Sequence, residues 1–132
     1  MVTAFYLDTS VAVHALAGTR AAVRWFEDTT GSEDQALLSS RILQTEITRV
    51  LRREHRAVVD RRRVLDYVDL VEIDETTLLA AETIGEHVKT LDAIHLATAM
   101  AIGADTVVVT HDRAMARVAA TLGLAAFDPI GG

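Results

Sequence analysis

The chain has 132 residues, which suits a single domain over residues 1–132, and its 50% hydrophobic and 24% charged residues exclude an intrinsically disordered protein. It contains no cysteine, which excludes a disulfide framework and a thiolate metal site, and no apolar run approaches the roughly 18 residues of a membrane helix, so we expect a cytoplasmic protein without a membrane partner. The formal net charge of −6 argues against broad electrostatic attraction to nucleic acid.

Five short β-type runs alternate with helical patterns along the chain. The runs are Thr3–Leu7, Ala36–Ser39, Leu70–Ile73, Thr106–Thr110 and Leu124–Phe127. Most of them are continuous apolar stretches, as expected for strands that are covered on both faces. The alternation predicts an α/β fold with a central parallel sheet of about five strands and helices on both faces. Ligands bind beyond the carboxyl ends of such strands, so residues that directly follow a strand are the first candidates for a site.

Asp8 directly follows the first predicted strand and is followed by Thr9 and Ser10. This position suits a carboxylate that binds a ligand at the edge of the sheet. Asp, Thr and Ser are also the residues that most often cap helices, and a helix cap is the favoured explanation of Asp8 when it is considered alone.

Glu46 occupies an unusual position within a predicted helix over residues 40–55. The apolar stripe of this helix consists of Ile42, Leu43, Ile47, Val50 and Leu51, and Glu46 lies within it, four residues from Ile42 and from Val50. A carboxylate on the inward face of a helix is costly unless it is paired or binds a metal. A cap cannot explain a residue in the middle of a helix, so the structural alternative is a salt bridge to a buried arginine.

The same helix and the segment after it carry the densest basic run of the chain. Within fifteen residues lie Arg49, Arg52, Arg53, Arg56, Arg61, Arg62 and Arg63. A solvated helix face and a ridge that contacts phosphates explain this run equally well. In the second interpretation, we expect Arg49, Arg52, Arg53 and Arg56 to contact the phosphate backbone of a nucleic acid.

Asp92 falls in the first turn of a helix that is predicted to begin near Thr90. A helix N-terminus favours a negative charge, which is one explanation for this acid. The rest of the helix is nearly all apolar and therefore predicts burial on most sides, so Asp92 needs partners. His95, three residues later, is interpreted as a histidine packed in the core, with a hydrogen bond to the site as the alternative.

Asp112 follows the fourth predicted strand and begins another helical pattern, "DRAMARVAATLG". The ordinary explanation is again a cap or a first-turn acid. Together with Asp8, Glu46 and Asp92, it completes a set of acids that the fold is expected to gather at one edge of the sheet.

Gathered carboxylates repel one another, so one or more would be protonated at neutral pH unless a cation lay among them. Oxygen ligands without cysteine suit Mg²⁺ or Mn²⁺ rather than a structural zinc ion. Mg²⁺ commonly takes one or two carboxylates, keeps several water molecules and binds substrate phosphates, which is typical of phosphoryl-transfer and nuclease sites.

Four segments resemble the PIN-domain nucleases, and most closely the VapC toxins of bacterial VapBC toxin–antitoxin pairs. The segments are "FYLDTSVAV", "TEITRVLRR", "LDAIHLATA" and "VVVTHDRAMARVAATLGL". The resemblance spans almost the whole chain and implies a three-layer α/β/α domain that hydrolyses RNA phosphodiesters with Mg²⁺ or Mn²⁺. The catalytic, metal-binding acids of the family fall on Asp8, Glu46, Asp92 and Asp112, and its small hydroxyl residue on Thr9, Ser10 or Thr110.

The resemblance also implies a cognate VapB-like antitoxin, a homodimer, and inhibition of translation and growth by the free toxin. One alternative is a PIN-like module that binds RNA or protein without catalysis. Another is a phosphatase of the haloacid dehalogenase type, although Ser10 stands where that chemistry requires a second aspartate. A receiver-like regulatory module would also place an acid after a strand, but it would not explain Glu46.

Overall fold

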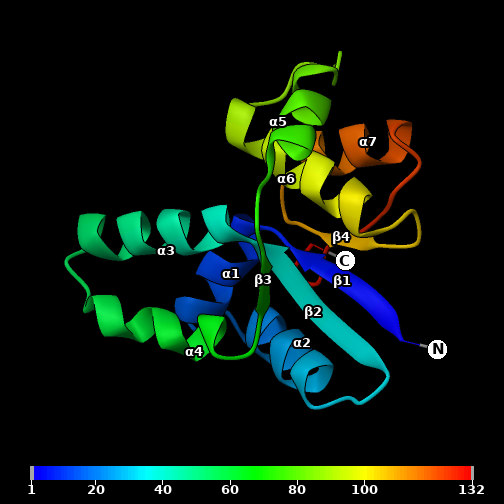
Figure 1. Cartoon of the computed structure of the whole chain (residues 1–132). Coiled ribbons are helices and arrows are strands. Elements are labelled where there is room, and N and C mark those ends of the chain that lie inside the picture. The colour runs from blue at the N-terminus through cyan, green and yellow to red at the C-terminus, as the bar shows by residue number, and fades with distance from the viewer. Residues whose placement is uncertain (1, 132) are drawn as a thin grey trace.

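A sheet of five parallel strands forms the centre of the computed structural model, which describes residues 2–131 (Figure 1). The strands are β1 (Thr3–Leu7), β2 (Gln35–Ser40), β3 (Asp69–Val71), β4 (Val107–Val109) and β5 (Ala125–Phe127). They lie in the order β3-β2-β1-β4-β5, so β1 is the central strand. The predicted sheet and its five strands are confirmed, with small shifts at the strand ends.

Helices cover both faces of this sheet, which confirms the three-layer α/β/α arrangement (Figure 1). The helices are α1 (Thr9–Leu16), α2 (Arg20–Thr30), α3 (Arg41–Arg53), α4 (Arg62–Leu65), α5 (Glu75–Glu82), α6 (Thr90–Ile102) and α7 (Arg113–Thr121), with a 3-10 turn at Val58–Arg61. None of the helices within residues 2–131 is long and apolar enough to cross a membrane.

The central strand supplies side chains to both hydrophobic cores, because successive residues of a strand point to opposite faces. Leu7 belongs to the core under α1 to α4, together with Val109 of β4. Tyr6 belongs to the core under α6 and α7, together with Val108. β1 therefore fixes the two helical layers relative to each other and ends directly before Asp8.

The order of the strands reverses at β1, since β2 pairs on one side of it and β4 on the other. This reversal places a crevice beyond the carboxyl ends of β1 and β4, where ligands of open α/β sheets bind. The Asp8 amide donates to the Val109 carbonyl over 2.9 Å and ties the two strand ends together.

α3 and α6 bring the remaining acids toward this crevice. α3 begins after Ser40, whose Oγ accepts a hydrogen bond from the Ile42 amide at 3.2 Å. Its buried face consists of Leu43, Ile47 and Leu51, which confirms the predicted apolar stripe beside Glu46. α6 begins at Thr90 as predicted, but it is less buried than its composition predicts, because Leu91 and Met100 are exposed.

Candidate active site

The four acids predicted to form a site line one cavity of about 360 Å³ in the crevice beyond β1 and β4. The cavity is lined by Asp8, Glu46, Asp92 and Asp112, together with Thr9, Ser10, Lys89, Thr90 and Leu91. The acids come from four separate segments that only the folded chain brings together. Sequence reasoning missed Lys89, the basic residue among these lining residues, because nothing in its surroundings distinguishes it from a surface lysine.

Asp8 is the most buried of these acids, with 4% of its surface exposed. Its Oδ2 accepts hydrogen bonds from Ser10 Oγ at 2.7 Å and from Thr110 Oγ1 at 2.8 Å. Asp8 stands at the N-cap position of α1, but its side chain makes no capping hydrogen bond there. The cap explanation is therefore wrong for this side chain. Within residues 2–131, no hydrogen bond is found at Oδ1, which leaves that oxygen able to bind a ligand.

Glu46 is half-buried, and its Oε1 accepts hydrogen bonds from His95 Nε2 at 2.6 Å and from Thr9 Oγ1 at 2.7 Å. Burial raises the pKa of this carboxyl, but the hydrogen bonds from His95 and Thr9 and the charge of His95 together lower it below its ordinary value. The partner of Glu46 is thus a histidine, and the alternative of a salt bridge to a buried arginine is wrong.

Asp92 lies in the first turn of α6 and has the opposite electrostatic environment. Burial, together with the negative charges of Asp8 and Asp112, raises the pKa of Asp92 to about 6. Across the part of the chain that the structure describes, no donor hydrogen-bonds to its carboxylate. The raised pKa of Asp92 therefore reflects its burial and the excess negative charge of the cavity.

Asp112 has two roles, because it caps α7 and also lines the cavity. Its Oδ1 accepts hydrogen bonds from the amides of Ala114 at 2.9 Å and Met115 at 3.3 Å. Its own amide donates to Thr110 Oγ1 over 3.0 Å. Thr110 thus connects the two strand-end acids, and all three candidate hydroxyl residues contact a carboxylate or its backbone.

His95 is completely buried in α6, as the core interpretation predicts, yet it also reaches the site through Glu46. Its Nδ1 lies 2.6 Å from the hydroxyl of Tyr6, whose side chain is also completely buried. Burial raises the pKa of Tyr6 to about 12, so the phenol keeps its proton at neutral pH. Sequence reasoning missed Tyr6, because an aromatic residue in a central strand is ordinary core material.

The donor set of the cavity fits a hydrated divalent ion better than a fully coordinated one. Among residues 2–131, no three His, Cys, Asp or Glu side chains are gathered closely enough to hold a metal by themselves. Mg²⁺ often takes only one or two carboxylates and keeps several waters, and Asp8 and Glu46 each have one oxygen without a hydrogen bond in that range. A cation would also relieve the repulsion that raises the pKa of Asp92.

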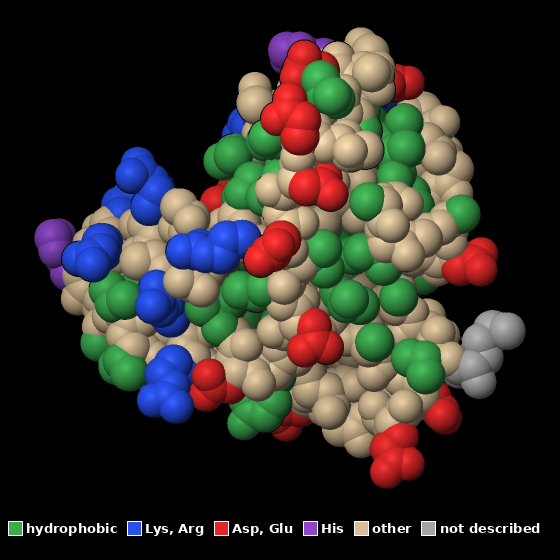
Figure 2. All heavy atoms as spheres, viewed as in Figure 1, with side chains coloured by type: hydrophobic (Ala, Val, Ile, Leu, Met, Phe, Trp, Pro, Cys, Tyr) green, Lys and Arg blue, Asp and Glu red, His purple; other side chains and the backbone are tan. Residues whose placement is uncertain are grey.

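Figure 2 shows Lys and Arg side chains gathered over α3 and α4, and no arginine of the basic run is among the residues that line the cavity. Arg56 is engaged internally, since its Nη2 donates to the Leu16 carbonyl over 3.0 Å and lies 3.8 Å from Asp60. Arg61 and Arg62 also have partners within the chain. Arg49, Arg52 and Arg53 are exposed and are the better candidates for contacts with RNA.

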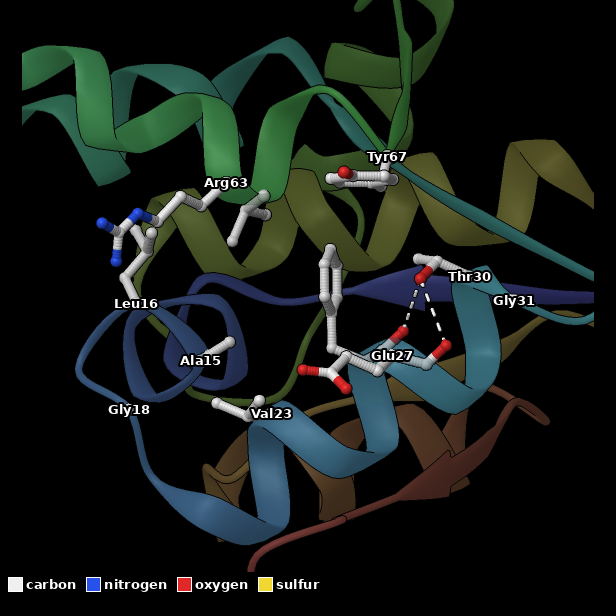
Figure 3. A pocket seen from close by; sticks show the side chains of 11 residues that line it. Ala15, Leu16, Gly18, Val23, Glu27, Thr30, Gly31, Arg63 and Tyr67 are labelled. Atoms are coloured by element: carbon white, nitrogen blue, oxygen red, sulfur yellow. Dashed lines mark hydrogen bonds between the residues drawn. The ribbon is translucent and has the colours of Figure 1, made fainter.

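A larger cavity of about 630 Å³ lies between α1, α2 and α4 (Figure 3). Its walls are mostly apolar, and the ring of Tyr67 packs edge-on against Phe26 with 6.0 Å between the ring centroids. Its charged lining residues are Glu27 and Arg63. A single carboxylate among mostly apolar side chains does not make a metal or acid–base site. The smaller cavity with its four acids is therefore the candidate active site, although its volume is smaller.

Comparison with known families identifies the α/β domain that brings the four acids together. Residues 5–121 match the PIN domain, so the chain belongs to the PIN-domain family. It is similar to Ribonuclease VapC46 of Mycobacterium tuberculosis (strain ATCC 25618 / H37Rv), with 43% identity over 70 residues. That match covers 52% of this chain and 54% of the relative, so it spans about half the length of the relative.

Solved structures share the fold over almost the whole chain at low identity. VapBC2 from Rickettsia felis, bound to a DNA fragment from its promoter, is 13% identical, covers 96% of this chain and 98% of that chain, and has a TM-score of 0.74. DNA-bound VapBC from Salmonella typhimurium is 19% identical, covers 98% and 99%, and also has a TM-score of 0.74. A toxin–antitoxin complex from Klebsiella pneumoniae is 21% identical, covers 94% and 96%, and has a TM-score of 0.73.

Proposed function

We propose that this protein is an endoribonuclease that hydrolyses RNA phosphodiester bonds with Mg²⁺ or Mn²⁺. The observation that carries the proposal is the convergence of Asp8, Glu46, Asp92 and Asp112 on one cavity in a chain of the PIN-domain family. The similarity to a ribonuclease over half of the chain supports the same activity.

The residues of the cavity would have different roles in binding and orientation. Asp8 and Glu46 would hold a divalent ion through the oxygens that their hydroxyl and imidazole donors leave open. Asp92 would complete that site, and Asp112 would orient water or help to hold a second ion. A bound ion would acidify water and offset the negative charge of the phosphodiester. Lys89, which lines the cavity, would add a positive charge for the substrate phosphate.

The exposed arginines Arg49, Arg52 and Arg53 would hold the RNA backbone beside this acidic cavity. Phosphate contacts of this kind give affinity that falls with salt and little choice of sequence. The positive arginines of α3 would attract RNA, while the negative cavity beside them would hold the cation that binds its phosphate.

We also propose that the protein is the toxin of a type II toxin–antitoxin pair and forms a homodimer. The relative and the three solved structures described above carry VapC, VapBC or toxin–antitoxin names, which supports this role. A VapB-like antitoxin could complement the cavity with an arginine, since guanidinium and carboxylate groups form strong paired hydrogen bonds. Free toxin would then stop translation and growth, and coexpression of a small protein encoded beside it should restore growth.

The activity can be tested with Asp8→Asn in an RNA cleavage assay with Mg²⁺ or Mn²⁺. This variant keeps the shape of the side chain but removes the charge, so we expect it to lose detectable cleavage. We expect the wild-type protein to lose cleavage in the same way when EDTA removes the metal. Asp105→Asn, in an exposed loop, is the matched control and should cleave normally. Cleavage by Asp8→Asn at the wild-type rate would overturn the site, and RNA binding without cleavage by the wild type would favour the non-catalytic alternative.

A further inference from the structure

A chain of hydrogen bonds runs from the core beneath α6 to the candidate site. The Tyr6 hydroxyl is 2.6 Å from His95 Nδ1, and His95 Nε2 is 2.6 Å from Glu46 Oε1. We propose, on the basis of the metal-dependent function above, that His95 is a positioning residue which, held in one orientation by Tyr6, fixes Glu46 as a ligand of the divalent ion.

The two partners of His95 hold the imidazole ring between them. An ionised carboxylate only accepts hydrogen bonds, so the His95 nitrogen that faces Glu46 carries a proton. The phenol of Tyr6 is completely buried, and its hydroxyl lies 2.6 Å from Nδ1, the other nitrogen of the ring. Nε2 is therefore the donor that faces Glu46.

The same two contacts fix the orientation of the imidazole ring. Turning the ring by half a rotation would place carbon atoms opposite Tyr6 and Glu46 and break both hydrogen bonds. The rings of Tyr6 and His95 also pack edge to face, with 5.6 Å between their centroids and 69° between their planes. Tyr6 thus orients the N–H donor of His95 toward α3.

His95 and Thr9 both bind Oε1 of Glu46, which fixes the rotation of the carboxylate. The other oxygen, Oε2, makes no hydrogen bond within residues 2–131. Asp8 shows the same arrangement, since Ser10 and Thr110 both bind its Oδ2. A glutamate has three side-chain torsions, so without such donors it would lose more conformational entropy on binding an ion. Outer partners of this kind typically change metal affinity by about 10- to 100-fold when they are removed.

The proton position can be tested in the wild-type protein without any substitution. Long-range ¹H–¹⁵N correlation spectra of the histidine side chains distinguish a proton on Nε2 from one on Nδ1. We expect a proton on His95 Nε2 in the metal-free protein at pH 7. An Nε2 that carries no proton would overturn the proposal.

The effect on the ion can be measured by calorimetric titration with Mn²⁺ in the absence of RNA. His95→Leu replaces the imidazole with an apolar side chain of similar size and removes the donor, so we expect Mn²⁺ affinity to fall by about 10- to 100-fold. His95→Gln keeps an N–H donor of similar reach and should bind Mn²⁺ several-fold more tightly than His95→Leu. A merely structural role for His95 would move the unfolding temperature of these variants and leave the affinity unchanged.

Tyr6→Phe provides a second variant in case His95→Leu does not fold. It removes one hydroxyl and should weaken Mn²⁺ binding less than His95→Leu, while the side-chain resonances of His95 shift because the contact at Nδ1 is lost. Tyr67→Phe, on the opposite face of the sheet, is the matched control and should change neither property. Wild-type spectra and affinity in Tyr6→Phe would overturn the proposal.

RNA cleavage separates the failure of this proposal from the failure of the proposed function. A wild-type protein that cleaves RNA, with Mn²⁺ affinity indifferent to His95, overturns only the positioning role. A protein that does not cleave RNA, but whose Mn²⁺ binding depends on His95, overturns the ribonuclease and supports the positioning role.

Discussion

The carboxylates in the two halves of the candidate site have opposite hydrogen-bonding and electrostatic environments. Asp8 and Glu46, at the start of α1 and within α3, each receive two hydrogen bonds on a single oxygen. Asp92, at the start of α6, receives none from residues 2–131, and burial and neighbouring charges raise its pKa to about 6. Hydrogen bonds within the protein organise the half that contains Asp8 and Glu46. In the other half, neighbouring carboxylates repel the charge of Asp92, and a cation would relieve this repulsion.

This difference shows how a protein can prepare a site for an ion that is not yet bound. Donors that bind one oxygen of a carboxylate stabilise its charge and fix its orientation, while the other oxygen stays able to bind. A carboxylate without donors gains most from the arrival of a cation. We therefore expect the two halves to respond differently to substitution, to pH and to metal.

The largest effect is expected from Glu46→Gln, which tests the organised half. The amide group cannot replace the charge of the carboxylate, and it turns an N–H donor or a weaker acceptor toward His95 and Thr9. We expect Mn²⁺-dependent RNA cleavage to fall by more than about 100-fold, beyond the effect typical of residues that only orient a ligand. The control is Glu33→Gln on an exposed loop. A loss of less than about tenfold would mean that Glu46 is not a direct ligand.

A smaller effect, a gain in stability, is expected from Asp92→Asn and is measured by thermal unfolding of the metal-free protein. The ordinary pKa of this carboxyl is 3.8, and its pKa in the folded protein is about 6. Its contribution to stability is therefore fully present below pH 3.8 and is lost as the pH rises through about 6. The variant, which carries no charge, should melt about 3 °C higher than the wild type at pH 8 and equally at pH 3.

Addition of Mn²⁺ sharpens this second prediction. At pH 8, the ion should stabilise the wild type and reduce or reverse the advantage of Asp92→Asn, because the wild type binds it more tightly. Asp105→Asn should melt like the wild type at both pH values, with and without the ion. An Asp92→Asn variant that is less stable than the wild type at pH 8 without metal would contradict a repulsive environment.

The smallest effect is expected from Ser10→Ala, which removes one of the two donors to Asp8 Oδ2 and leaves Thr110 in place. We expect Mn²⁺ affinity to fall by about tenfold, at the lower end of the range for residues that orient a ligand. Ser32→Ala, on an exposed turn, is the control and should bind Mn²⁺ normally. An unchanged affinity would show that Thr110 alone is enough to hold Asp8.

Much of the fold and most of the acids could be predicted from sequence, because they depend on local patterns. Apolar runs that alternate with helical patterns give the strands, and the end of a parallel strand gives the place of Asp8 and Asp112. Glu46 could be found because a carboxylate within an apolar stripe breaks a periodicity that a short stretch of sequence shows.

The contacts that orient these acids could not be predicted in the same way, because they join distant segments. Tyr6 and His95 are 89 residues apart, and each is ordinary core material in its own element. Local sequence also cannot choose between explanations that are both true, as for Asp112, which caps α7 and lines the cavity. For Asp8 considered alone, local sequence favoured a cap, whereas its Oδ2 accepts hydrogen bonds from the hydroxyls of Ser10 and Thr110.

The strand order has a consequence for the synthesis of the protein. β4 is the direct neighbour of the central β1, although more than a hundred residues separate their first residues. A growing chain can fill the space beside β1 only after Val107–Val109 has left the ribosome, and Asp112 follows still later. Asp8 and Glu46 lie early in the chain, so the complete set of four acids can assemble only after Asp112 has been synthesised.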